Sequence, residues 1–277
     1  MLRLAVVACH ALLAFARGPI RPYDRGTTTF SPDGSLHQTT YASAAAIRGS
    51  LAVAVSNGGD ALAICVSKPP GSALKLDGET TDAGGKIFFV DERVAIVFAG
   101  LAADGRAIAN SVRLECQRHR LIAGTPASVA HVAGYVAQLQ HECTRTGSRR
   151  LYGVESIVVG FEFGGFGHRA RVPRIFVTGP AGELQEWSAA SIGAGAGQAR
   201  ETMEAECSTL NRMDAHKLVR LAARSVLAAK PNPAPATTTE VVLLDSRGRR
   251  SRCAATLVDG ELTIRELQLD GARVPGG

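Results

Sequence analysis

The chain has 277 residues, of which 45% are hydrophobic, so it can bury a sizeable core and is not a mainly disordered protein. Its formal net charge of +6 at pH 7 implies a mildly basic surface, but the basic residues are dispersed and no aromatic stacking pattern accompanies them. We therefore expect no nucleic-acid partner. Beyond the N-terminal run, no stretch approaches the length of a membrane-spanning helix, so we expect no membrane partner either.

The N-terminal extension, residues 1–22, begins with a segment that is typical of a secretory signal peptide. MLRLAVVACHALLAFA carries Arg3 before an apolar run, and Ala14-Phe15-Ala16 fits a small-x-small cleavage site. The run is too short to span a bilayer as a helix. Taken alone, it predicts a secreted protein of unknown role, which stays one alternative.

The first half of the chain reads as two hairpins followed by two helices. Asn57-Gly58-Gly59-Asp60 separates two short apolar runs and predicts a hairpin turn, because Asn and Gly tolerate positive φ. A second turn is expected at Asp91-Glu92-Arg93. The expected strands are 51–56, 61–67, 86–90 and 94–99. Apolar residues then recur at helical spacing in two stretches, about 101–121 and 126–143, and Pro126 suits the first turn of the second helix.

The second half repeats this order of strands and helices. Pro180-Ala181-Gly182 turns between two of its strands, and the proline-rich KPNPAPA at 230–236 ends the helical part. The expected strands are 155–162, 174–178, 183–188, 240–245, 253–258 and 262–265. The expected helices are about 197–208 and 214–229. Two antiparallel sheets with helix pairs on their outer faces satisfy this order within one α+β domain.

The cysteines and histidines give no sign of a metal site or of a disulfide framework. The six cysteines form no Cys-x-x-Cys pair and lie in or beside apolar or helical stretches, so we expect buried, reduced thiols. The seven histidines are scattered along the chain, and we expect no bound metal.

Two other motifs have an ordinary structural explanation. Gly193-Ala194-Gly195-Ala196-Gly197 precedes a helix and could hold a phosphate at the helix N-terminus. It lacks the Lys-Ser/Thr of a P-loop, so a tight strand-to-helix turn is the preferred interpretation. The basic run RGRRSR at 247–252 is interpreted as a solvated turn between two strands.

Four stretches of the chain carry a resemblance to a known family. YDRGTTTFSPDGSLHQTTYA (23–42) is very similar to the signature that opens the alpha-type subunits of the 20S proteasome core. The other three are FAGLAADGRAIANSVRLECQRHRL (98–121), SRRLYGVESIVVGFEFGG (148–165) and PRIFVTGPAGELQEWSAASIG (173–193). The resemblance covers about residues 23–265, and the pieces ECQRHRL and GFEFGG are most similar to the alpha type-7 branch of the family.

The resemblance implies a four-layer αββα sandwich, the fold of the N-terminal nucleophile hydrolases. The alpha-subunit domain would span 23–265, between a signal-like or gating tail at 1–22 and a C-terminal tail at 266–277. It also implies a non-catalytic structural subunit, without cofactor, of a heteroheptameric outer ring that gates substrate entry in ubiquitin-dependent protein degradation. The implied partners are other alpha subunits, beta-ring subunits, the regulatory ATPase particle, other activators and unfolded protein substrates. The implied location is the cytoplasm and nucleus, with the signal-like N-terminus judged spurious.

The signature also implies the residues of a gate. Pro32-Asp33-Gly34 is a turn former and would lead into a short helix from about Ser35 to Arg48. In the family, this helix fills the cleft in which a beta subunit holds its active threonine. Four positions match family residues that cluster with neighbouring subunits to hold the gate open: Tyr23, Asp24, Pro32 and Tyr41. Alternatively, these residues only fix the turn within each subunit.

Lys86, just before an expected strand, matches the family lysine that lines a pocket between subunits, where activators insert a C-terminal carboxylate. A lone ammonium in a partly apolar slot is a suitable carboxylate receptor. Several positions depart from the family pattern, which leaves the gate contacts open. Thr40 replaces the usual glutamate, Ser35 a basic residue and Leu151 a proline, while the loop 166–172 is longer and the usual lysine-rich C-terminal tail is missing.

A threonine hydrolase, like the catalytic beta subunits of the proteasome, is the remaining alternative. If the chain were cut after Gly26, the amine of Thr27 could act as general base for its own hydroxyl. Those subunits also need an Asp about sixteen and a Lys about thirty-two residues further on to activate the threonine. Ser43 and Gly59 stand at those places, so we expect no catalytic residue.

Overall fold

The structure of the chain is a computed structural model that describes residues 23–24, 26–67, 85–163, 171–229, 238–258 and 261–270. Its helices are α2 (His37–Ile47), α3 (Ala102–Ala123), α4 (Val129–Arg145), α5 (Ala196–Glu204), the 3-10 helix η1 (Cys207–Arg212) and α6 (Ala215–Ala228). Its strands are β1 (Ala52–Ser56), β2 (Ala61–Ser67), β3 (Ile87–Phe89), β4 (Val94–Gly100), β5 (Val154–Phe163), β6 (Arg171–Thr178), β7 (Leu184–Trp187), β8 (Ala189–Ile192), β9 (Thr238–Asp245), β10 (Arg250–Val258) and β11 (Glu261–Asp270). The signal-like N-terminal segment lies outside the described residues.

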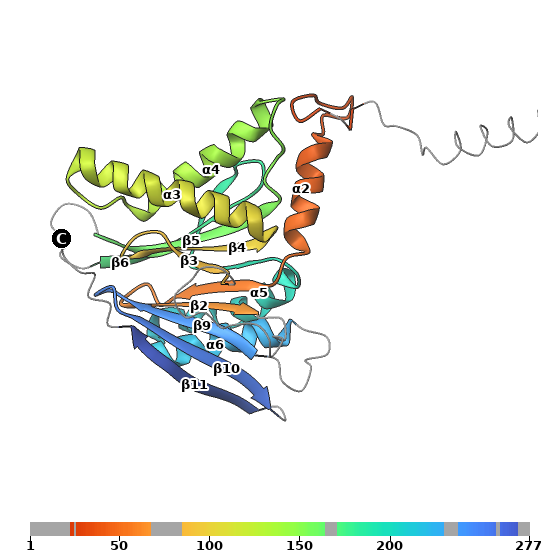
Figure 1. Ribbon diagram of the computed structural model, residues 1–277. Helices are drawn as coiled ribbons and strands as arrows, with labels where there is room; N and C mark the ends of the chain where they lie inside the picture. The colour runs from red at the N-terminus through yellow and green to blue at the C-terminus, as the bar shows by residue number, and fades with distance from the viewer. Residues whose placement is uncertain are drawn as a thin grey trace, which may run out of the picture.

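The strands form two antiparallel sheets that pack face to face between two pairs of helices (Figure 1). One sheet has the order β11-β10-β9-β2-β1-β8 and is covered by α5 and α6. The other has the order β3-β4-β5-β6-β7 and is covered by α3 and α4. The prediction of a four-layer α+β sandwich is therefore confirmed.

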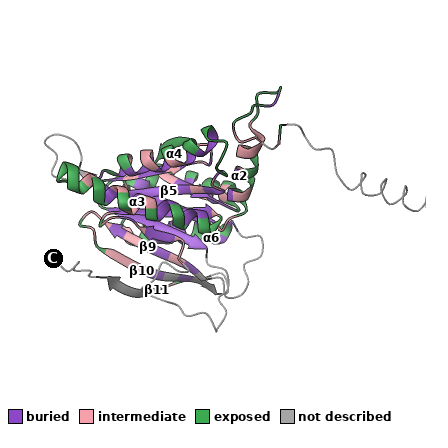
Figure 2. Cartoon of the chain, turned by 45° about the horizontal axis from the view of Figure 1, so that its top comes forward, coloured by how far each residue is buried: buried purple, intermediate pink, exposed green. Residues whose placement is uncertain are grey.

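The continuous apolar runs of β1 and β2 follow from burial on both faces of the six-stranded sheet. Val53 and Val55 pack against the helices α5 and α6. Ala52 and Ala54, on the opposite face, pack against the five-stranded sheet. Figure 2 shows the result, with buried strands in the middle layers and exposed residues on the outer faces of the helices.

The expected strand 183–188 is present as β7, but the strand that follows it, β8, was not expected. The chain changes sheets at Ser188: β7 pairs with β6 in the five-stranded sheet, and β8 pairs with β1 in the six-stranded one. The backbone O of Ser188 accepts a hydrogen bond from the N–H of Ser56, at 3.2 Å. Ser188 lies at a bend of the backbone between the two strands.

Element boundaries differ from the expectations at two other places. Pro126 does not lie in the first turn of α4; the helix begins three residues later, with Ser128 as N-cap and its hydroxyl accepting from the N–H of His131 at 3.1 Å. Near the other end of the chain, the expected strand 262–265 is longer in the structure, where β11 runs to Asp270. The division of the chain at residues 22 and 265 stays a prediction.

The structure also places the cysteines and the glycine-rich turn. Among the described cysteines four are buried, whereas Cys207 is exposed, contrary to expectation. Burial, assisted by nearby acidic groups, raises the pKa of Cys116 to about 11, so this thiol stays protonated. Gly193 packs against the chain before β1, because a Cβ there would lie 2.7 Å from the carbonyl O of Ser50. This close approach supports the strand-to-helix turn.

Two absences hold for the described part of the chain. None of its helices is long and apolar enough to cross a membrane. It also contains no group of three or more His, Cys, Asp or Glu side chains that could hold a metal ion.

Candidate functional site

The predicted turn at Pro32 closes in the structure as a short backbone loop. The N–H of Gly34 donates to the carbonyl O of Ser31 at 2.9 Å, and the N–H of Ser31 donates to the carbonyl O of Ser35 at 2.9 Å. Gly34 has a φ of 77°, a left-handed conformation that glycine adopts without strain. Pro32 itself is exposed at the tip of this loop, which leads directly into α2.

Two of the predicted gate residues contact each other. The hydroxyl of Tyr41, on α2, donates to Oδ1 of Asp24 at 2.7 Å. The side-chain amide of Gln38 donates to the backbone O of Asp24, so Asp24 is held twice by α2. The rings of Tyr23 and Tyr41 remain 36% and 45% exposed. These contacts fix the signature within the chain and leave both aromatic rings accessible to a neighbour.

Helix α2 packs against the ends of β4 and β5, at one end of the sandwich (Figure 1). Three glycines permit this close packing. A Cβ at Gly49 would lie 2.0 Å from the backbone N of Gly100, and a Cβ at Gly100 would lie 2.2 Å from the carbonyl O of Gly153. Since a Cβ at Gly100 would also lie 3.1 Å from Cα of Ala46, the backbone of α2 directly covers this end of the sandwich.

A small apolar cluster secures the outer part of α2. Ala42 on α2 packs with Cys143 of α4 and with Leu151, which is only 3% exposed. Leu151 is the residue that replaces the usual proline of the family. Its side chain therefore has a packing role between α2 and α4.

A bidentate ion pair lies beside this cluster, at the start of α3. The two terminal nitrogens of Arg150 donate to the two oxygens of Asp104 at 2.9 and 2.7 Å, and the N–H of Gly153 donates to the same carboxylate at 2.9 Å. Burial alone would raise the pKa of Asp104, but these hydrogen bonds and the charge of Arg150 hold that pKa below its usual value. The pair fixes the segment that leads into β5, against which α2 packs.

Thr27, the alternative nucleophile, lies beside the C-terminal end of α4. Its hydroxyl donates to the backbone O of Thr146 at 3.5 Å, at the end of α4. Gly59, at the place of the catalytic lysine, lies in the β1–β2 turn, which contacts the far helical layer through a bond from Asn57 to the backbone O of Met213 at 3.3 Å. Both sheets separate α4 from that layer. Ser43, at the place of the aspartate, is half-buried on α2.

Lys86 directly precedes β3, at the edge of the five-stranded sheet. Its side chain is half-buried, and burial lowers its pKa; no charged group among the described residues contributes to this shift. No described hydrogen bond or ion pair joins Lys86 to the signature residues, so the structure does not bring the two predicted sites into contact within one chain. A partly desolvated ammonium of this kind is stabilised by an incoming carboxylate.

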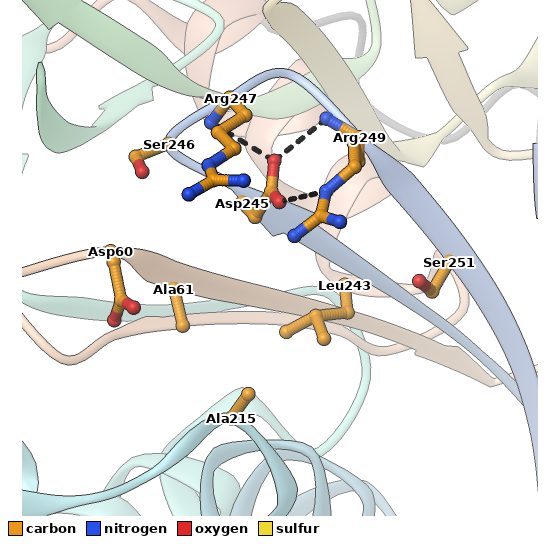
Figure 3. A pocket seen from close by; sticks show the side chains of 9 residues that line it. All are labelled: Asp60, Ala61, Ala215, Leu243, Asp245, Ser246, Arg247, Arg249 and Ser251. Atoms are coloured by element: carbon orange, nitrogen blue, oxygen red, sulfur yellow. Dashed lines mark hydrogen bonds and ion pairs between the residues drawn. The ribbon is translucent and has the colours of Figure 1, made fainter. Parts of the chain in front are cut away.

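A pocket of about 390 Å³ lies elsewhere, at the β9–β10 turn, and contains none of the predicted site residues (Figure 3). It is lined by Asp60, Ala61, Ala215, Leu243, Asp245, Ser246, Arg247, Arg249 and Ser251. Figure 3 shows Asp245 bonded to Arg249 and to the backbone of the turn. Its two acidic and two basic side chains balance in charge.

Sequence reasoning missed two residues that hold the signature in place. Gln38 lies within the family signature, but no spacing rule indicates that its amide reaches the backbone of Asp24. Arg150 lies 46 residues from Asp104, and neither residue stands in a motif that predicts their pairing.

Comparisons with known proteins agree with this geometry. Residues 52–241 match the family described as proteasome subunit, and residues 23–45 match the N-terminal signature of its alpha-type members. The chain is 35% identical over 205 residues to a proteasome subunit alpha type-7-like protein of Macaca fascicularis, covering 74% of this chain and 78% of that one. It is 35% identical over 209 residues to proteasome subunit alpha type-7 of Caenorhabditis elegans, covering 76% and 78%. It is 37% identical over 182 residues to proteasome subunit alpha type-8 of Mus musculus, covering 66% and 68%. The chain belongs to the proteasome subunit family, as an alpha-type member.

Proposed function

We propose that this chain is a non-catalytic subunit of the outer alpha ring of a 20S proteasome core, where it helps to gate the entry of unfolded substrates. The observation that carries this proposal is the signature turn followed by α2, packed across the end of the sandwich against Gly100. A helix in this position excludes a substrate from that end of the domain. The exposed rings of Tyr23 and Tyr41, together with Pro32, are proposed as the surface that neighbouring alpha subunits contact.

Assembly tests the proposal directly. We expect the tagged chain in a native extract to elute from a sizing column in a particle many times larger than its own 28.9 kDa. Mass spectrometry of that fraction should identify other alpha subunits and beta-ring subunits. A single peak at the mass of the free chain, under conditions that keep a known proteasome subunit assembled, would count against the proposal.

The absence of catalysis is tested at Thr27. We expect Thr27→Ala to leave every peptidase activity of the assembled particle unchanged, because neither Ser43 nor Gly59 can supply the groups that activate a threonine. The measurement is hydrolysis of a panel of fluorogenic peptides by particles that contain the wild-type chain or the variant. Selective loss of one cleavage specificity would assign Thr27 a catalytic role.

We further propose that Lys86 receives the terminal carboxylate of an activator, such as the regulatory ATPase particle. Its half-buried position and its lowered pKa support this role. Lys86→Ala removes a charge-assisted hydrogen bond, so we expect about ten- to a hundredfold weaker docking at this one pocket. Avidity through the other pockets of the ring hides part of this loss.

The measurement for Lys86 is the activator concentration that gives half-maximal stimulation of peptide hydrolysis, at fixed ionic strength. Lys217→Ala is the matched control, because Lys217 is an exposed lysine of α6. Equal half-stimulation for wild type and Lys86→Ala, in intact rings, would show that Lys86 has no part in docking.

The location of the protein follows from this assignment as a further proposal. A proteasome subunit of this kind is expected in the cytoplasm and nucleus. Imaging of the protein with a C-terminal fluorescent tag tests this, and a signal confined to the secretory pathway would favour the signal-peptide interpretation of residues 1–16.

A further inference from the structure

The end of the sandwich opposite α2 carries a cluster of arginines around the β9–β10 turn. Arg171, the first residue of β6, donates from Nη1 to the carbonyl O of Ser246 at 2.7 Å. The side chain of Arg93, in the β3–β4 turn, lies against Gly248. A Cβ added at Gly248 would lie 3.4 Å from Cγ of Arg93 and 3.6 Å from Nε of Arg93. Two guanidinium groups from the five-stranded sheet are thus held against one three-residue segment of the other sheet. Arg247, exposed in that segment, adds a third.

The turn that carries Arg93 is held in place by another arginine. The guanidinium of Arg250 lies 3.9 Å from the ring centroid of Phe89 and donates to the carbonyl oxygens of Asp91 and Glu92 at 3.0 and 2.7 Å. These bonds tie the β3–β4 turn to the start of β10. The backbone that carries Arg93 is therefore held beside the β9–β10 turn, which lowers the entropic cost of binding a ligand there.

Three of the acidic residues nearby are already engaged by arginines, whereas the carboxylate of Asp60, in the adjoining pocket, accepts from the side-chain amide of Asn57 at 3.2 Å. Asp245 accepts from the N–H of Arg247, from the N–H of Arg249 and from Nε of Arg249, at 3.0, 2.7 and 2.6 Å. Asp91 and Glu92 form ion pairs with Arg120 at 2.6 and 3.6 Å. In the part of the chain that the structure describes, no carboxylate forms an ion pair with Arg93 or Arg247.

The pKa of Arg171 reflects the excess of positive charge in this region. Burial and the neighbouring charge of Arg93 lower the pKa of Arg171, and the opposing contribution of Asp245 is the smallest of the three. Two positive charges that repel each other at a fixed distance are stabilised by an anion that contacts both. The guanidinium groups of Arg93 and Arg247 present N–H donors in planar arrays, a geometry that matches the oxygens of a phosphate.

We propose that the arginine cluster, Arg93, Arg171 and Arg247, binds a phosphate group. The pocket in Figure 3 borders the same turn through Ser246 and Arg247 and offers room for the remainder of a phosphate-bearing molecule. The site lies at the opposite end of β4 from α2, since Arg93 precedes this strand and Gly100 ends it; seven residues of strand span about 23 Å. The proposal is therefore independent of the gating role.

Calorimetric titration of the full-length chain with inorganic phosphate and with triphosphate tests this proposal, at an ionic strength of about 0.15 M to screen diffuse surface charge. We expect Arg93→Gln to weaken binding of both anions about ten- to a hundredfold, the loss expected for one charge-assisted contact. Arg118→Gln is the matched control, because it removes the same charge from a side chain of α3 that is 72% exposed. We expect this control to bind like the wild type.

A check of the fold and a second variant distinguish a loss of phosphate binding from a loss of folding. Arg171→Gln also removes the bond to Ser246, and its loss of binding counts only if circular dichroism shows an intact fold. The side chain of Arg93 makes no described hydrogen bond, so we expect Arg93→Gln to fold. If Arg171→Gln does not fold, Arg93→Gln by itself is sufficient to test the proposal. Equal binding by Arg93→Gln and wild type, equal losses in Arg93→Gln and Arg118→Gln, or no binding of either anion to the wild type would each overturn the proposal. Tighter binding of ATP than of triphosphate would support it and identify a nucleotide as the source of the phosphate.

Discussion

Gly100→Ala is expected to destabilise the folded chain by about 2–5 kcal/mol, the sum of backbone strain and overpacking. Gly100 has a φ of 116°, which residues with a side chain rarely adopt. Its new Cβ would lie 2.2 Å from the carbonyl O of Gly153 and 3.1 Å from Cα of Ala46, so β5 or α2 would have to move. The measurement is the free energy of unfolding from urea denaturation of the full-length chain.

Gly134→Ala is the matched control for this substitution. Gly134 lies within α4, and a Cβ there meets no atom within 4 Å. We expect it to be neutral or to stabilise the chain by up to about 1 kcal/mol, because alanine is the better helix former. A Gly100→Ala protein as stable as wild type would show that α2 does not pack closely on this end of the sandwich. If Gly100→Ala is insoluble while Gly134→Ala folds, the expected loss of stability at Gly100 is still supported.

Asp104→Ala is expected to destabilise the chain by about 2–3 kcal/mol above pH 5. The substitution removes a carboxylate that is only 6% exposed and leaves the buried N–H of Gly153 without its partner. Arg150 can still reach water, because its side chain is 66% exposed, so the loss stays below that of a fully buried ion pair. Glu201→Ala, an exposed carboxylate on α5, is the control with the same charge change.

The effect of Asp104 depends on pH in a defined direction. Its pKa is lowered in the folded chain, so the unfolded chain binds this proton more readily. The stabilisation is therefore complete above the ordinary aspartate pKa of about 3.9 and is lost as the pH falls through the lower folded value. Unfolding curves at several pH values should show the difference between wild type and Asp104→Ala shrinking on acidification. A difference that is constant or grows below pH 4 would contradict the ionised pair.

Local signals in the sequence predict most of the fold. Asn57 and Gly58 place the first hairpin turn where the structure has it, with Gly58 at a φ of 68°. The apolar runs of β1 and β2 predict strands buried on both faces, and helical spacing predicts α3, α4 and α6. The signature at 23–42 predicts the turn at Pro32 and the helix after it, because both depend on residues that are close in sequence.

Features that depend on distant residues could not be predicted in this way. The change of sheet at Ser188 could not be predicted, because neither glycine nor proline stands at the bend between β7 and β8. The packing of α2 needs glycine at 49 and 100, and each is explained only by its close approach to the backbone of another segment. The arginine cluster joins two turns and the start of β6, which lie far apart in the chain, whereas the sequence suggested only a solvated basic turn at 247–252.

The position of the chain within its particle tests the central claim most directly. We propose to determine the structure of the native particle, purified through a tag on this chain, by electron cryo-microscopy. The account predicts that the chain lies in an outer ring, with α2 intact, residue 27 preceded by further chain, and Tyr23 and Tyr41 in contact with a neighbouring subunit. Density for the chain in an inner ring, beginning at a free Thr27, would contradict it.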